Sequence, residues 1–355
     1  MTDTNRLGFE TVALDDEASA LVIVDQTRLP NERKILRLTT QKETWDAIYL
    51  LQVRGAPAIG VAAAYGIYLA AKGIETSDYS EFEKKFAEAR EYLNSARPTA
   101  VNLSWALSRM GKIVEAGREE GVAAIKKRLL AESRAIQTED IEMCRKIGEH
   151  GLSLLKPGMG LLTHCNAGQL ATSRYGTATA PMYLGHERGY GFRIFCDETR
   201  PLLQGARLTA YELSAAGMDV TLLCDGMAAS AMRNGWVDAV FTGADRVAAN
   251  GDAANKIGTF PLAIAAKRFG VPFYICAPSS TIDMKTSTGK DIKIEQRPAE
   301  EVTTMWYKER MAPENIKVFN PAFDVTDADL ITAIITEKGV LRPPFTESLK
   351  AAINV

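Results

Sequence analysis

The feature that most constrains this fold is an alternation of apolar runs and helical stretches that begins at Gly158. Five short apolar runs are separated by segments with apolar residues at helical spacing. The runs are residues 161–165, 192–196, 220–224, 239–242 and 272–277, and the clearest helical segments are 199–216, 228–234 and 258–269. Such alternation predicts an α/β fold with a doubly wound parallel sheet. The runs are continuously apolar, as strands buried on both faces are.

The chain before residue 158 has a different pattern. Three short runs rich in aliphatic residues predict a small antiparallel sheet, and longer segments predict helices. We expect the last helix to be bent or broken near residue 138, where Thr138 can cap. The expected strands are 9–14, 20–25 and 34–38, and the helices start at 41 and continue through 58–72, 79–94, 100–116 and 119–155. We predict an N-terminal domain over 1–130 and a C-terminal domain over 131–355. After Pro321 we expect a short helix, 327–338, and a proline-rich end.

Composition excludes several classes of protein. A net charge of -2 with 24% charged residues lacks the basic excess of a general nucleic-acid or anionic-membrane surface. No apolar stretch is as long as a membrane span, and residues 1–5 are polar with no signal core after them. The 5 cysteines are scattered, without Cys-x-x-Cys spacing, which argues against disulfides or zinc. We expect a cytoplasmic protein with reduced thiols.

Two of the predicted strand ends carry candidate catalytic groups. Cys165 lies between His164 and Asn166, and Asp245 follows Gly243-Ala244. Because the carboxyl ends of parallel strands meet at one rim, where ligands bind in open α/β sheets, a thiol and a carboxylate there can form an acid/base pair. Each residue also has a plain structural reading: a buried cysteine packs as a small hydrophobe, and an aspartate after a strand often stabilises a turn.

Cationic residues stand at three predicted helix starts. Arg54 precedes Gly55-Ala56-Pro57, Lys256 follows Asn255 in an expected loop, 250–258, that leads into a helix, and Arg97 precedes Pro98. A helix start with a nearby cation is a natural site for phosphate. Taken singly, each of these charges is better explained as a solvated surface charge. Together they favour an anionic ligand.

Five motifs in this order identify a family resemblance. They are Arg54-Gly55-Ala56-Pro57-Ala58-Ile59-Gly60, Arg97-Pro98-Thr99-Ala100-Val101-Asn102-Leu103, Thr163-His164-Cys165-Asn166-Ala167-Gly168, Asp197-Glu198-Thr199-Arg200-Pro201, and Gly243-Ala244-Asp245-Arg246 with Asn255-Lys256-Ile257-Gly258-Thr259. Over nearly its whole length the chain resembles the S-methyl-5-thioribose-1-phosphate isomerases of methionine salvage. The wider superfamily includes ribose-1,5-bisphosphate isomerases and regulatory subunits of eukaryotic translation initiation factor 2B.

The resemblance implies an aldose-to-ketose isomerisation in which Asp245 protonates the ring oxygen and Cys165 acts at C2. Cys165 would either remove a proton or stabilise a hydride shift, and the two routes stay open. It also implies a Rossmann-like C-terminal domain without a dinucleotide, no metal or organic cofactor, and a homodimer. The implied ligand contacts are Arg54, Gly55, Ala56, Arg97, Gln204, Asn255 and Lys256.

Two alternatives remain beside this interpretation. A ribose-1,5-bisphosphate isomerase would share Cys165 and Asp245 but would need a second cationic site in place of an apolar pocket. A non-catalytic subunit of a translation factor would have no need to keep the thiol and the carboxylate together. The Arg54–Gly60 motif and the strand-bearing N-terminus favour the first hypothesis.

Overall fold

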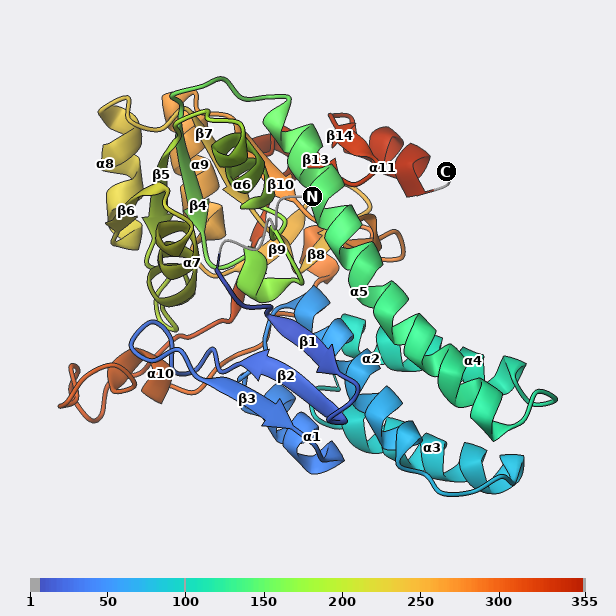
Figure 1. Cartoon of the computed structure of the whole chain (residues 1–355). Helices are drawn as coiled ribbons and strands as arrows, with labels where there is room; N and C mark the ends of the chain where they lie inside the picture. The colour runs from blue at the N-terminus through green and yellow to red at the C-terminus, as the bar shows by residue number, and fades with distance from the viewer. Residues whose placement is uncertain (1–6, 99, 354–355) are drawn as a thin grey trace. The chain divides into compact units, whose positions relative to one another are not determined.

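The computed structural model describes residues 7–98 and 100–353, which form two compact units (Figure 1). The first unit comprises Met1–Met143 and Gln169–Gly176, and the second comprises Cys144–Gly168 and Thr177–Val355. The division falls within the long helix α5 (Val122–Leu152). No helix within the described ranges has the length and apolar character needed to cross a membrane.

The first unit packs helices around α2 beside a three-stranded antiparallel sheet. Its strands are β1 (Val12–Asp15), β2 (Ala20–Val24) and β3 (Ile35–Leu38), and its helices are α1 (Gln41–Tyr49), α2 (Ala56–Lys72), α3 (Tyr79–Asn94) and α4 (Val101–Ala116). Helix α2 is buried on almost every side and contacts the other three helices and two of the strands. Its sequence is rich in alanine and aliphatic residues, as a central helix requires.

The predicted break in α5 is wrong, because the helix continues through residue 138. The Thr138 hydroxyl donates to the Arg134 carbonyl one turn back, at 3.0 Å, instead of capping a new helix. The neighbouring Gln137 accepts from the Tyr65 hydroxyl at 2.6 Å and donates to the Val12 carbonyl at 2.8 Å. These polar residues therefore connect the helix to its neighbours without interrupting it.

A seven-stranded sheet forms the core of the second unit, in the order β14-β13-β10-β7-β4-β5-β6. All neighbouring pairs are parallel except β13 with β14. The strands are β4 (Gly160–His164), β5 (Arg193–Asp197), β6 (Asp219–Leu223), β7 (Ala239–Thr242), β10 (Phe273–Cys276), β13 (Ala333–Thr336) and β14 (Gly339–Leu341). The predicted fold class and its five parallel strands are confirmed.

Helices cover both faces of this sheet, as the continuous apolar strands require. Val240 belongs to one apolar cluster with Ala231 of α8 (Ala228–Arg233) and Leu262 of α9 (Thr259–Phe269). Phe241, the next residue, points to the opposite face. There the last turns of α5 approach Phe241 and pack on α6 (Ala180–Glu187).

The tail differs from its sequence prediction. The helix expected over 327–338 is wrong: β12 (Phe323–Thr326) comes first, β13 and β14 follow, and α11 (Phe345–Ile353) comes last. All residues of β13 are buried because the strand lies between β10 and β14. Two of them are isoleucines, whose branched side chains pack well on a pleated surface.

The segment around Asn250 contains strands where a loop was expected. The strands β8 (Arg246–Ala248) and β9 (Ala253–Lys256) pair with each other and, with β11 (Ile282–Asp283) and β12, form a four-stranded sheet. The short helix α10 (Glu300–Thr303) lies in the long connection between β11 and β12. The expected loop therefore begins with a tight turn and places Asn255 and Lys256 at the end of a strand.

Candidate active site

The strand order places the ends of β4 and β7 at the switch point of the sheet. From β4 the chain adds β5 and β6 on one side, and it then returns to add β7 and β10 on the other. Ligands bind at such a point in open α/β sheets. Thr163 and His164 pair with Phe241 and Thr242, so the segments carrying Cys165 and Asp245 leave the sheet side by side. The predicted meeting of these two strand ends is confirmed.

Cys165 has a backbone conformation that is unusual for a side-chain-bearing residue. Its φ is 64°, in the left-handed region, and two threonines hold it there. The Cys165 N–H donates to the Thr199 hydroxyl at 2.8 Å, and the Thr209 hydroxyl donates to the Cys165 carbonyl at 2.6 Å. The residue is buried and takes part in no disulfide. This fixed backbone gives the thiol a defined starting direction.

The turn after β5 explains why the helix expected from Thr199 is absent there. Thr199 and Leu203 have positive φ, and the helical turns begin only at Gly205, with a π-helical turn. The Asp225 carboxylate accepts from the N–H groups of Thr199 and Arg200 at 2.7 and 2.8 Å. Sequence reasoning missed Thr199, Thr209 and Asp225 as supports of Cys165. The Asp197-Glu198-Thr199-Arg200-Pro201 motif contained this signal, but we used it only as part of the family resemblance.

Asp245 is exposed and lies in the turn between β7 and β8. Its N–H donates to the Ala254 carbonyl at 2.8 Å, which fixes the turn to β9. Further along β9, the buried Asn255 amide donates to the Thr259 hydroxyl at 3.0 Å. Asp245 and Asn255 are thus supported by the same small sheet.

The start of α9 differs from the open anion site that the sequence suggested. The Gly258 N–H already donates to the Asp324 carboxylate at 2.8 Å, and burial raises the pKa of that carboxyl. The Lys256 ammonium lies 4.4 Å from the centre of the Phe323 ring. An anion at this position would therefore depend on the lysine more than on the helix amides.

Gln204 is a buried amide at the start of an unusual helical turn. It precedes a π-helical turn, Gly205–Thr209, that leads into α7 (Ala210–Ala215). Its Oε1 has no hydrogen-bond partner among the residues that the structure describes. Buried acceptors are nearly always satisfied, and π-helical turns are frequent at functional sites. Both observations agree with a ligand contact at Gln204.

The other predicted contacts, Arg54, Gly55, Ala56 and Arg97, belong to the first unit. Ala56 begins α2 and Gly55 precedes it with a φ of 91°. A Cβ on Gly55 would lie 2.4 Å from the Ala171 Cα, so only glycine fits. Arg97 lies just before α4, and its carbonyl accepts from the Ala100 N–H at 2.9 Å. Thr99 of the same motif lies outside the described residues.

Gly55→Ala is expected to destabilise the protein by about 3 kcal/mol, because it combines a positive φ with overlap against backbone. Gly121→Ala is the matched control, since Gly121 has a φ of 83° but nothing within 4 Å of an added Cβ. It should cost about 1–2 kcal/mol from backbone strain alone. Urea unfolding of both variants measures the difference, and equal effects would contradict a close approach of Ala171.

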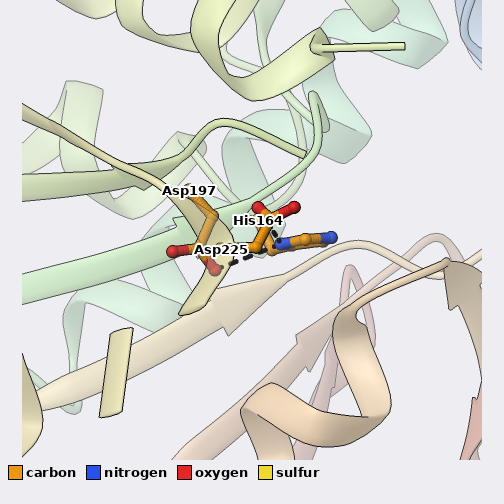
Figure 2. A group of neighbouring side chains, drawn as sticks. All are labelled: His164, Asp197 and Asp225. Carbon is orange, nitrogen blue, oxygen red and sulfur yellow. Dashed lines mark hydrogen bonds and ion pairs between the residues drawn. The ribbon is translucent and has the colours of Figure 1, made fainter. Parts of the chain in front are cut away.

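His164, which directly precedes Cys165 in sequence, forms a compact group with Asp197 and Asp225 (Figure 2). The His164 Nδ1 lies 3.1 Å from the Asp197 Oδ2 and 3.9 Å from the Asp225 Oδ1. Burial raises the pKa of Asp197 to about 6. Burial by itself would lower the pKa of His164, but the hydrogen bond and charge of Asp197 outweigh it and raise that pKa. The ligand atoms of the three residues lie within 4.8 Å of one another, close enough to share a proton or hold a metal ion.

This α/β chain, with a cysteine and an aspartate at the switch point of its sheet, matches the model of a known family. The model of the initiation factor 2 subunit family matches residues 52–343, and the chain belongs to this family. Within it, the methylthioribose-1-phosphate isomerase of Symbiobacterium thermophilum is 66% identical over 341 residues, which cover 96% of this chain and 95% of that protein. With such relatives the chain is an isomerase of the aldose–ketose class.

Two further similarities have comparable extent. The 5-deoxyribose 1-phosphate isomerase of Petrotoga mobilis is 59% identical over 339 residues, covering 96% of this chain and 97% of that protein. The crystal structure of 5-methylthioribose 1-phosphate isomerase from Pyrococcus horikoshii superposes with a TM-score of 0.94 at 43% identity, covering 99% of this chain and 98% of that one.

Proposed function

We propose that this chain converts S-methyl-5-thio-α-D-ribose 1-phosphate into S-methyl-5-thio-D-ribulose 1-phosphate, a step of methionine salvage. The observation that carries the proposal is the placement of the Cys165 and Asp245 segments on paired strands at the switch point of the sheet. The 66% identity to a protein named methylthioribose-1-phosphate isomerase supports the choice of substrate.

Asp245 is the proposed acid for opening the sugar ring. The 1-phosphate blocks the anomeric oxygen, so the sugar cannot open to a free aldehyde in the usual way. Protonation of the ring oxygen by the Asp245 carboxyl allows the bond from C1 to that oxygen to break, and the oxygen leaves as the C4 hydroxyl. Such proton transfer accelerates a reaction about 10²–10⁴-fold.

Cys165 is the proposed group at C2. In one route its thiolate removes the C2 proton, and a proton is then delivered to C1. In the other, hydride moves from C2 to C1 and Cys165 assists as the C2 hydroxyl becomes a carbonyl. Either route oxidises C2 and reduces C1 within one molecule, so no external oxidant or reductant is needed. The C2 hydroxyl proton returns to the Asp245 carboxylate and replaces the proton given to the ring oxygen.

The proposed binding groups are three cationic side chains, two amide side chains and the start of one helix. Arg54, Arg97 and Lys256 provide positive charge for the phosphate, and amide side chains of Gln204 and Asn255 suit sugar hydroxyls. The backbone at Gly55 and Ala56 contributes the start of a helix, where anions bind favourably.

A second candidate substrate is 5-deoxyribose 1-phosphate. The observation that favours it is the 59% identity to a protein of that named activity. The two sugars share the reacting carbons and the phosphate, and they differ only by a methylthio group or a hydrogen at C5. The same catalytic residues therefore serve either substrate, and specificity depends on the pocket around C5.

A competition of sugar phosphates tests the proposal. We expect kcat/KM for the methylthio sugar to exceed that for the deoxy sugar by at least about tenfold, since one extra apolar group is worth 10–200-fold in a fitted pocket. Ketose formation from each sugar, and from ribose 1,5-bisphosphate, is followed by NMR. Faster conversion of the deoxy sugar supports the second candidate. Conversion of the bisphosphate alone contradicts both, and no conversion of any sugar favours a regulatory subunit.

We also propose that the chain acts as a cytoplasmic homodimer, as the family resemblance implies. An edge strand of the large sheet supports self-association: β6 carries the exposed Leu222, and the exposed Met227 and Trp236 follow it in sequence. Light scattering coupled to size-exclusion chromatography checks this, and a monomer at micromolar concentration would contradict it.

A further inference from the structure

His164, the last residue of β4, connects three separate parts of the second unit. Its side chain is buried, with 1% of the residue exposed. The Nδ1 atom lies 3.1 Å from the Asp197 Oδ2 at the end of β5, and the Nε2 atom lies 2.9 Å from the Ile257 carbonyl oxygen between β9 and α9. The ring thus reaches from the strand that precedes Cys165 to the turn that follows Lys256.

The two acceptors define where the ring protons are. A carbonyl oxygen only accepts, so the His164 Nε2 carries a hydrogen and donates it to Ile257. The Nδ1 atom then shares a second proton with the Asp197 carboxylate. The Asp225 carboxylate lies 3.9 Å from Nδ1. The carboxyl group of Asp324, on β12, also interacts electrostatically with the ring. These three carboxyl groups favour a protonated His164.

The ring also packs directly against the turn. Gly258 has a φ of 103°, and a Cβ on this residue would lie 2.6 Å from the His164 Cε1. A glycine is therefore needed for the backbone to come this close to the imidazole. The turn is held by this contact and by the hydrogen bond to Ile257 together.

We propose that His164 is a positioning residue for the isomerase reaction: it fixes the Asn255–Lys256 segment relative to Cys165. This inference rests on the proposed function and adds a role that the catalytic pair does not fill. One end of the connection is the peptide that joins His164 to Cys165. The other end is the Ile257 carbonyl, one residue beyond Lys256.

Stability alone is a weak reason for such a buried pair. Taking an imidazolium and a carboxylate out of water costs several kcal/mol per ion, and well-packed apolar residues often stabilise as much or more. The Asp197 Oδ1 also has no hydrogen-bond partner among the residues described. The pair instead fixes the orientation of the imidazole ring, because its two nitrogens contact acceptors on different parts of the chain.

Two substitutions test the two ring contacts of His164 one at a time. The amide nitrogen of His164→Asn approximates Nδ1, so it keeps the contact with Asp197 and loses Ile257. The amide nitrogen of His164→Gln approximates Nε2, so it keeps Ile257 and loses Asp197. His150→Asn is the matched control, because His150 lies on α5 in the same unit and serves no candidate function.

For His164→Asn we expect KM to rise and kcat to fall, each about tenfold, and amide exchange of residues 253–258 to accelerate about tenfold. For His164→Gln we expect exchange and KM within about threefold of the unsubstituted protein, and His150→Asn should change nothing. Unchanged exchange and kinetics in His164→Asn overturn the proposal, as does equal impairment of the Asn and Gln variants. The exchange experiment needs no substrate, so it stands even if the protein converts none of the sugars tested.

The pH dependence gives a second test if His164→Asn does not fold. The pKa of His164 is raised above its ordinary value of 6.5. The contacts of the protonated ring with Asp197 and Ile257 are therefore intact below pH 6.5, and they weaken as the pH rises through the folded-state pKa. Exchange of residues 253–258 should therefore accelerate at alkaline pH beyond the intrinsic effect of hydroxide. In Asp197→Asn a neutral amide donates to Nδ1 and both ring bonds persist, so this additional acceleration should vanish. If the additional acceleration persists in Asp197→Asn, the proposal is overturned. If EDTA changes the exchange, a metal ion rather than a shared proton links His164 to Asp197, which also overturns the proposal as stated.

Discussion

Cys165→Ser is expected to reduce turnover by about 10⁴-fold while the dissociation constant of the sugar phosphate stays within a few-fold. Serine has nearly the same size and keeps the backbone hydrogen bonds to Thr199 and Thr209. Its hydroxyl ionises far less readily than a thiol, so it replaces neither a thiolate base nor a polarisable group at C2. Isomerisation followed by NMR, with binding by calorimetry, measures the two quantities separately.

Cys224→Ser is the matched control for this prediction. Cys224 also follows a strand of the same sheet, but its side chain is exposed and lies beyond β6, away from the switch point. Its replacement should leave kcat and KM unchanged. Full activity of Cys165→Ser would remove Cys165 from the mechanism, and equal loss in both variants would indicate a general effect of the thiols.

Asp245→Asn should lower kcat/KM by a hundredfold or more. The amide has the size of the carboxyl group and still forms hydrogen bonds, but it cannot transfer a proton to the ring oxygen. The Asp245 N–H bond to Ala254 is unaffected, because it involves only the backbone. Steady-state kinetics together with a thermal melt distinguish a chemical loss from a folding defect.

Asp219→Asn provides the comparison for Asp245→Asn. Asp219 is an exposed aspartate at the opposite, N-terminal end of β6, where no ligand is expected. This variant should retain the kinetics of the unsubstituted protein. A less than threefold effect of Asp245→Asn would refute the role of Asp245 as the acid.

The large sheet was predictable from local pattern because its central strands are continuous apolar runs. The run 239–242, for example, coincides with β7. The tail was not predictable in this way. β13 is a strand because it pairs with β10 and β14, and the polar residues that flank its short apolar run mask the pattern. The break expected near Thr138 failed because a threonine also fits inside a helix when its hydroxyl bonds back to the preceding turn.

The candidate site was predictable to the extent that it follows from strand ends. Cys165 and Asp245 come directly from the rule that parallel strands end at one rim. Gln204 and the exact set of ligand contacts came from the family resemblance. The Asp324 carboxylate at the start of α9 is 66 residues from Gly258 in sequence, and nothing near either residue signals the contact. Long-range hydrogen bonds of this kind depend on the completed fold.

The left-handed backbone of Cys165 has a consequence for how substrate-binding energy is used. A residue in this conformation costs of order 1–3 kcal/mol, which the surrounding hydrogen bonds offset during folding. In the proposed reaction the Cys165 thiol is therefore oriented before any sugar arrives, and its ordering does not reduce the affinity for the ligand. Contacts to the phosphate and hydroxyls are then available to stabilise the opened sugar, which is the species the enzyme must favour to be fast.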